Sequence, residues 1–283
     1  RLPCSGRVPT EFVFKVLKSG LRNIVSIQCE DAFCRFKQGT KINTRRLLLG
    51  RAVLEQLGFK PDALKVVKYS RKVFYETDEC VGCDKCVFIC PYQAIEAESF
   101  ATPKVLNESC MGCGACALVC PHHAIQVKGF EFQSVLNQYG ESAAKLKAEG
   151  KSPVILVFCC QWSEFSALDE SESLLFKKNA IALEVPCFKA LDPVHVVNAL
   201  RNGFDGVMAV VCSAEDCKLQ EGREISERNM TVLKDALKKM NLLQRFELFE
   251  ASPRCVGDFN QRLDDFCRKV AAMPPLKLVK AEA

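Results

Sequence analysis

The sequence predicts an α/β protein in which two parallel-sheet domains, the first truncated and the second complete, flank a small cysteine-rich α+β domain. One observation is a repeat at an offset of 30 residues within a chain of 283 residues, and another is a repeat at an offset of 183 residues. The third is an alternation of short apolar runs with helical patterns, which is typical of a parallel sheet covered by helices. The predicted segments are a truncated domain at 1–73, a cysteine-rich domain at 74–129, a helical linker at 130–151 and a complete domain at 152–275.

Cysteine content is the unusual feature of the composition, with 18 residues in a chain that is 48% hydrophobic and 26% charged. This composition is typical of a globular protein, and the short spacings between cysteines favour metal ligation over disulfides. No apolar run approaches the roughly 18–20 residues that span a bilayer, so we expect no transmembrane segment. The net charge of +5 is modest and its basic residues are scattered, so we expect no nucleic-acid partner.

The 30-residue repeat consists of two runs of the form C-x2-C-x2-C-x3-C-P. In bacterial ferredoxins, the fourth cysteine of each such run ligates the cluster that the other run holds. The pattern therefore predicts two [4Fe–4S] clusters, and Gly82, Gly112 and Gly114 would allow the tight loops around them. A zinc site is the alternative, although zinc motifs rarely pack four cysteines so tightly and repeat them with proline. The predicted ligands are Cys80, Cys83, Cys86 and Cys120 for the first cluster and Cys90, Cys110, Cys113 and Cys116 for the second.

The 183-residue repeat takes Cys4, Cys29 and Cys34 onto Cys187, Cys212 and Cys217 without a gap over about 55 residues. Apolar runs in the second copy predict parallel strands, and cap residues and apolar spacing predict helices between them. The first copy lacks a counterpart of the first of these strands, which would map before residue 1, so we expect a longer parent protein. The predicted strands are 154–158, 181–185, 207–211 and 245–249. Two predicted helices follow the caps Asp192 and Ser226, and the last spans 258–271.

Cysteines follow three successive strands of the second copy: Cys160 (or Cys159), Cys187, and the pair Cys212 and Cys217. Because parallel strands end at one edge of a sheet, we expect these thiols to converge there and hold a [2Fe–2S] cluster or a zinc ion. The alternative is that they are buried side chains acting as small hydrophobes. In the first copy, the three equivalent cysteines would form a partial site. Two remaining cysteines, Cys255 and Cys267, have no partner at ligand spacing and are expected to be structural.

Several motifs resemble the iron–sulfur delta subunit of methyl-viologen-reducing hydrogenase: Cys4-Ser-Gly-Arg, Cys29-x4-Cys34, Phe158-Cys-Cys-x-Trp and Cys212-x4-Cys217. This resemblance implies one or two [2Fe–2S] clusters that pass electrons from a hydrogenase or formate dehydrogenase to heterodisulfide reductase. The added ferredoxin-type domain resembles the C-terminal part of the A-type subunit of heterodisulfide reductase and of a quinone-modifying oxidoreductase component. There are two departures from the family pattern. Ser163 stands where the family has a further cysteine, and Phe188-Lys-Ala replaces Ser-Gly-Arg.

We therefore expect a non-catalytic iron–sulfur subunit in the cytoplasm, held at a membrane only through its partners. It would relay electrons between a hydrogenase, formate dehydrogenase or quinone-linked partner and a heterodisulfide reductase-like flavoprotein complex. FAD is expected only in an upstream region or in a partner, since the flavin domain of the A-type relatives has no counterpart here. Two other functions fit the cysteine pattern: a disulfide reductase that uses the cluster at the sheet edge, and a zinc-bearing structural protein that docks larger subunits.

Overall fold

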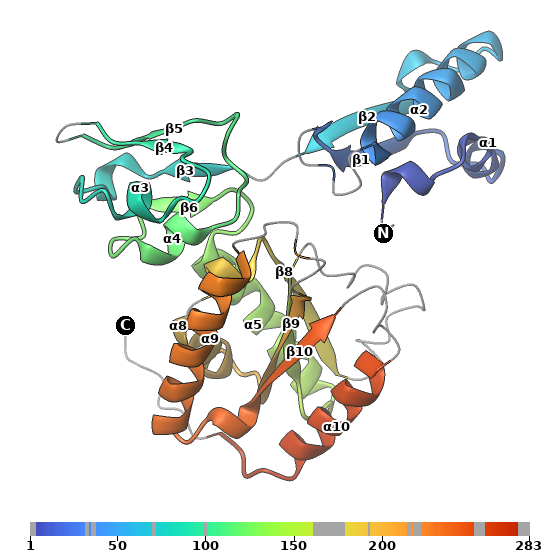
Figure 1. Cartoon of the computed structure of the whole chain (residues 1–283). Coiled ribbons are helices and arrows are strands. Elements are labelled where there is room, and N and C mark those ends of the chain that lie inside the picture. Colours follow the sequence, from blue (N-terminus) through green and yellow to red (C-terminus); the bar gives the residue numbers. More distant parts are fainter. Residues whose placement is uncertain are drawn as a thin grey trace. The chain divides into compact units, whose positions relative to one another are not determined.

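The computed structural model describes residues 4–31, 34, 38–69, 72–98, 101–160, 179–191, 193–213, 217, 222–251 and 258–276. The chain divides into two units, Arg1–Ser70 and Arg71–Ala283, which Figure 1 shows as ribbons. The second unit contains both the cysteine-rich part and the complete α/β part, and buried residues from both parts join in one core.

A four-stranded parallel sheet forms the centre of the α/β part of the second unit. Its spatial order is β10-β9-β7-β8, and every neighbouring pair is parallel. The two central strands, β7 and β9, contain no charged residue because helices cover both faces of the sheet. All four predicted strands are confirmed, with ends shifted by one or two residues. Their bounds are β7 (Ile155–Cys160), β8 (Ala180–Val185), β9 (Gly206–Cys212) and β10 (Phe246–Ala251).

Helices α5 (Phe132–Ala148), α8 (Pro193–Arg201) and α9 (Gly222–Lys239) pack on one face of this sheet, and α10 (Phe259–Ala271) packs on the other (Figure 1). Successive side chains of a strand point to opposite faces. Leu156, Phe158 and Cys160 of β7 therefore join the core under α8 and α9, while Ile155, Val157 and Cys159 join the core under α10.

Two sequence predictions for this part were wrong in detail. The helix expected to begin at Ser226 begins one turn earlier, at Gly222, so Ser226 is not its N-cap. Arg245 belongs to a 3-10 turn, Leu243–Arg245, and the last strand begins after it. The predicted cap Asp192 and the residues Trp162, Ser163 and Cys255 lie outside the described residues.

The cysteine-rich part consists of short elements related by the 30-residue offset. Helix α3 (Lys85–Ile89) maps onto α4 (Ala115–Val119) with identical bounds. Strand β3 (Val73–Tyr75) pairs antiparallel with β6 (Ile125–Val127), and β4 (Ile95–Glu96) pairs antiparallel with β5 (Lys104–Val105). Elements this short bury little apolar surface of their own, so bound clusters would contribute much of the stability of this part.

The first unit has the same local structure as part of the second. Its elements are η1 (Ser5–Arg7), α1 (Thr10–Lys18), β1 (Ile24–Cys29), α2 (Gly39–Gln56), η3 (Pro61–Ala63) and β2 (Leu64–Tyr69). The 183-residue offset takes η1, α1 and α2 onto η5 (Phe188–Ala190), α8 and α9 with identical bounds, so the long repeat is confirmed as a structural repeat. Strands β1 and β2 are parallel, as are their counterparts β9 and β10.

The described residues of the first unit include no counterpart of β7, β8 or α10. One face of its sheet is correspondingly open. Val25 and Ile27 of β1 are 56% and 69% exposed, whereas their counterparts Met208 and Val210 are fully buried. The difference arises because α10 covers that face in the second unit.

Candidate metal centres

Four cysteines line a first cavity in the cysteine-rich part: Cys80, Cys83, Cys86 and Cys120. Three come from the first run and the fourth from the second, which is the grouping that the motif predicts. The loop before α3 turns sharply because Gly82 and Asp84 have positive φ angles of 65° and 55°. Sequence reasoning identified the glycine and missed Asp84, which occupies the position of Gly114 in the repeat; aspartate is one of the few other residues that adopt this conformation.

A second cavity is lined by Cys90, Cys110, Cys113 and Cys116, again three cysteines from one run and one from the other. Gly112 and Gly114 have φ angles of 58° and 83°, as their predicted role in the loop requires. The structure therefore brings the eight cysteines together as the two sets of four that sequence spacing defines.

Backbone amides point at the sulfurs of both sets. The N–H of Ala94 donates to Cys90 Sγ at 3.3 Å, and at the equivalent place in the repeat the N–H of Ala124 donates to Cys120 Sγ at 3.2 Å. Such hydrogen bonds stabilise thiolates and raise the reduction potential of the cluster that they hold. In the first set, the hydroxyl of Tyr75 lies 3.1 Å from Cys86 Sγ.

Burial favours the protonated form of three of these thiols in the absence of a metal. It raises the pKa of Cys86, raises that of Cys113 to about 11 and raises that of Cys116 well above its usual range. A metal must therefore displace protons on binding and supply the positive charge that makes thiolates favourable. Two converging sets of thiols, with half of the eight cysteines buried and amide donors around them, fit iron–sulfur clusters, which are held by cysteine thiolates.

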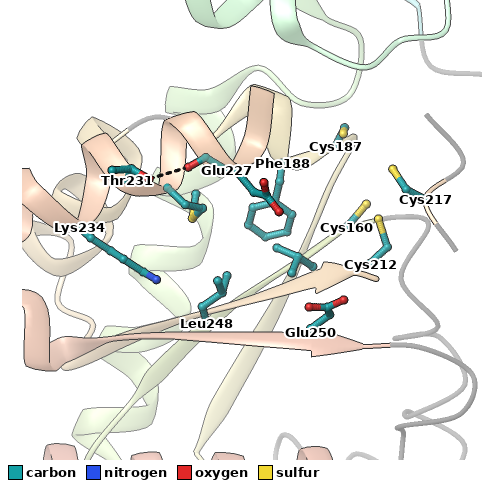
Figure 2. Close-up of a pocket in the computed structure, with 12 residues that line it drawn as sticks. Cys160, Cys187, Phe188, Cys212, Cys217, Glu227, Thr231, Lys234, Leu248 and Glu250 are labelled. Carbon is teal, nitrogen blue, oxygen red and sulfur yellow. Dashed lines mark hydrogen bonds between the residues drawn. The ribbon is translucent and has the colours of Figure 1, made fainter. Parts of the chain in front are cut away.

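A third set of cysteines lies at the carboxyl edge of the parallel sheet. Figure 2 shows the sulfurs of Cys160 and Cys212 side by side, with Cys187 and Cys217 on the same side of the cavity. This cavity has a volume of about 380 Å³. Cys160 ends β7, Cys212 ends β9, and Cys187 follows β8 directly before η5. The sequence prediction placed these four thiols together, and the structure does so.

The thiols of the third set interact directly. Hydrogen bonding with Cys187 and then with Cys212, together with burial, raises the pKa of Cys160 well above its usual range. The same hydrogen bond from Cys160 lowers the pKa of Cys187 despite the burial of Cys187. The hydrogen bond thus shifts the pKa values of these two neighbouring thiols in opposite directions. Full ionisation of the set requires a bound cation or cluster.

Cys159 does not belong to this set. Its side chain lies on the α10 face of β7, where its Sγ–H group donates to the carbonyl oxygen of Val157 at 3.4 Å. Of the two neighbouring cysteines that the sequence offered, the structure places Cys160 with the other thiols. Cys267 packs against the same α10 core, as expected of a structural cysteine.

The first unit carries three cysteines at the places that correspond to Cys187, Cys212 and Cys217. Cys4 precedes η1, Cys29 ends β1, and Cys34 is buried before α2, with the N–H of Thr40 donating to its Sγ at 3.4 Å. The described residues of this unit include no counterpart of Cys160.

The cysteine sets differ in geometry from a site for a single metal ion. Across the described residues of the whole chain, no three His, Cys, Asp or Glu side chains are grouped as ligands of one metal ion. In a [4Fe–4S] cluster each thiolate binds a different iron, so the sulfurs stand farther apart than they do around one ion.

The second and third sets are adjacent, and sequence reasoning missed this contact. Cys113, Ala115 and Cys187 form one buried cluster, against which Cys217 packs. The backbones approach closely here, since a Cβ added to Gly114 would lie 2.5 Å from the Cβ of Ala190. A contact between residues that are far apart in the sequence leaves no local pattern.

Comparisons with known proteins show which families the two parts of the sequence match. Residues 1–81 and 155–274, more than half of the chain, match the family described as methyl-viologen-reducing hydrogenase, delta subunit. The chain belongs to this delta subunit family. Residues 73–127 match the 4Fe–4S dicluster domain, so the delta-type chain also contains that domain.

Relatives of this delta-type chain belong to two kinds of complex. It is 28% identical over 204 residues to the A-type subunit of the ferredoxin/F(420)H(2)-dependent CoB-CoM heterodisulfide reductase of Methanosarcina acetivorans, and the match covers 71% of this chain and 25% of the relative. It is 25% identical over 134 residues to the D-type iron–sulfur subunit of the vhc F420-non-reducing hydrogenase of Methanococcus voltae, covering 46% of this chain and 93% of the relative. The chain is thus an iron–sulfur electron-transfer subunit related to both kinds of protein.

The delta-type chain spans about a quarter of the length of the heterodisulfide reductase subunits that it matches. No helix within the described residues has the length and apolar composition needed to cross a membrane.

Proposed function

We propose that this chain relays electrons through three neighbouring iron–sulfur sites. The relay would run between a hydrogenase, formate dehydrogenase or quinone-linked partner and a heterodisulfide reductase-like flavoprotein complex. FAD would belong to that partner or to an upstream region. The proposed ligands are Cys80, Cys83, Cys86 and Cys120 for one [4Fe–4S] cluster, Cys90, Cys110, Cys113 and Cys116 for the other, and Cys160, Cys187, Cys212 and Cys217 for a [2Fe–2S] cluster.

The observation that carries this proposal is the packing of Cys113 against Cys187 in one buried cluster. Electron tunnelling falls off steeply with distance, so neighbouring ligands of two sites favour transfer between them. If the second and third cysteine sets held unrelated metal sites, nothing would require Cys113 and Cys187 to be in contact.

The protein's own residues would hold and tune the clusters, which accept and donate single electrons when bound. Amide donors such as the N–H groups of Ala94 and Gly112 would stabilise thiolate charge on the 4Fe–4S ligands. The sheet core under α8 and α9 would keep water away from Cys160, which is 2% exposed. In the first unit, Cys4, Cys29 and Cys34 would supply three of the four thiolates that a further cluster needs.

Electron paramagnetic resonance of the reduced protein tests the proposed relay. After anaerobic purification and stepwise reduction, the signals of the second [4Fe–4S] cluster and of the [2Fe–2S] cluster should broaden or split each other, because the two paramagnets are neighbours. The first [4Fe–4S] cluster should show no such coupling to the [2Fe–2S] cluster. Signals that add without interaction at every stage of reduction would contradict a relay through adjacent sites.

A further inference from the structure

Lys189 is a buried cation in an unusual place. It lies in η5, directly after Cys187 and Phe188, and its side chain is fully buried. Its Nζ has no hydrogen-bond partner among the described residues. The ammonium does face the aromatic ring of Tyr92, whose centroid lies 5.6 Å away.

Such a group is costly unless something compensates its charge. An isolated ammonium loses its hydration on burial, and one cation–π contact offsets only part of that loss. The offset of 183 residues takes Gly6 of the first copy onto Lys189. The second copy therefore has a charge where the first has no side chain at all.

The surroundings of Lys189 identify the missing countercharge. Tyr92 lines the cavity of the second cysteine set and packs in the buried cluster that joins Cys113 to Cys187. The ammonium interacts electrostatically with both of these thiols. A site built from four thiolates around an iron–sulfur core is net negative, so two such sites would supply the negative charge that balances the buried ammonium.

We infer that Lys189 is a positioning residue whose fixed positive charge is shared by the second [4Fe–4S] cluster and the [2Fe–2S] cluster and raises the reduction potential of both. This inference rests on the proposed function. Each reduction adds one electron to a cluster and moves no proton, so the reduced site gains one negative charge. Lys189 stabilises that added charge. It thereby favours electrons on the two sites at the junction over the first [4Fe–4S] cluster.

Replacing Lys189 by methionine removes the charge and keeps a long, flexible side chain, and Lys189→Arg is the matched control that keeps the charge. Redox titrations followed by electron paramagnetic resonance would compare both variants with the unaltered protein. In Lys189→Met the ratio of reduced to oxidised second cluster at a fixed potential should fall about tenfold, a shift of about 59 mV towards negative values for a one-electron couple. The [2Fe–2S] cluster should shift in the same direction.

The first [4Fe–4S] cluster is the internal reference and should keep its potential in both variants. Equal potentials in Lys189→Met and the unaltered protein, or an equal shift of all three clusters, would overturn the inference. If Lys189→Met fails to assemble the junction clusters and Lys189→Arg assembles them, the positive charge is required and the inference stands. If both variants fail, the shape of the lysine side chain is required and the inference is overturned. Absence of cluster signals from the unaltered protein would instead refute the proposed function.

Discussion

Cys90→Ala is expected to remove the second [4Fe–4S] cluster and leave the first intact, although Cys90 belongs to the first run of cysteines. The reason is that Cys90 lines the cavity of Cys110, Cys113 and Cys116, at the opposite end of α3 from the rest of its own run. Losing one of four ligands in a buried site should lower ferredoxin-type iron by about half. Iron analysis and electron paramagnetic resonance of the reduced variant would measure this.

Two reference variants make the result unambiguous. Cys110→Ala removes a ligand of the second cavity only, and Cys83→Ala removes a ligand of the first cavity only. The spectrum of Cys90→Ala should match that of Cys110→Ala. A match with Cys83→Ala would mean that each run holds its own cluster, and the proposed ligand sets would be wrong.

The second large effect is expected at the sheet edge, where Cys160→Ala should abolish the [2Fe–2S] cluster. Cys160 is the thiol that contacts both Cys187 and Cys212. Its loss leaves three thiolates and opens a coordination position in the site. The loss of the [2Fe–2S] signal, with both [4Fe–4S] signals retained, would be followed by electron paramagnetic resonance and visible circular dichroism.

Cys159→Ala is the matched control, since Cys159 is the preceding residue of the same strand and is equally buried. Like Cys160→Ala, it removes one sulfur atom from β7, but on the opposite face of the sheet. It should retain the cluster and lower the free energy of unfolding by on the order of 1 kcal/mol, the cost of a small cavity. Loss of the cluster in Cys159→Ala, or its retention in Cys160→Ala, would contradict the assigned ligand.

Local pattern was sufficient to predict much of this fold and the grouping of its cysteines. Strands β7 and β9 were predictable because unbroken apolar runs are typical of a sheet covered on both faces, and β8 and β10 because short, largely apolar runs alternate with helical patterns. The offsets of 30 and 183 residues also predicted which helices correspond, and α1 and α8 do so residue for residue.

Features that depend on packing were not predictable in the same way. The choice between Cys159 and Cys160 depends on the register of β7, and a shift of one residue exchanges the two faces. The helix expected to begin after a cap at Ser226 starts at Gly222. A serine can cap a helix only where the preceding residues are not helical, and the residues before Ser226 are helical. The contact of Gly114 with Ala190 and the burial of Lys189 arise between segments far apart in the chain, so neither leaves a pattern in its own segment.

Iron and acid-labile sulfide per chain, measured after anaerobic purification, test the central claim most directly. The 4Fe–4S dicluster domain alone accounts for eight atoms of each, as two clusters of four. A [2Fe–2S] cluster at Cys160, Cys187, Cys212 and Cys217 adds two, so the predicted result is about ten iron atoms and about ten sulfides. Eight of each would contradict the third site and with it the three-site relay.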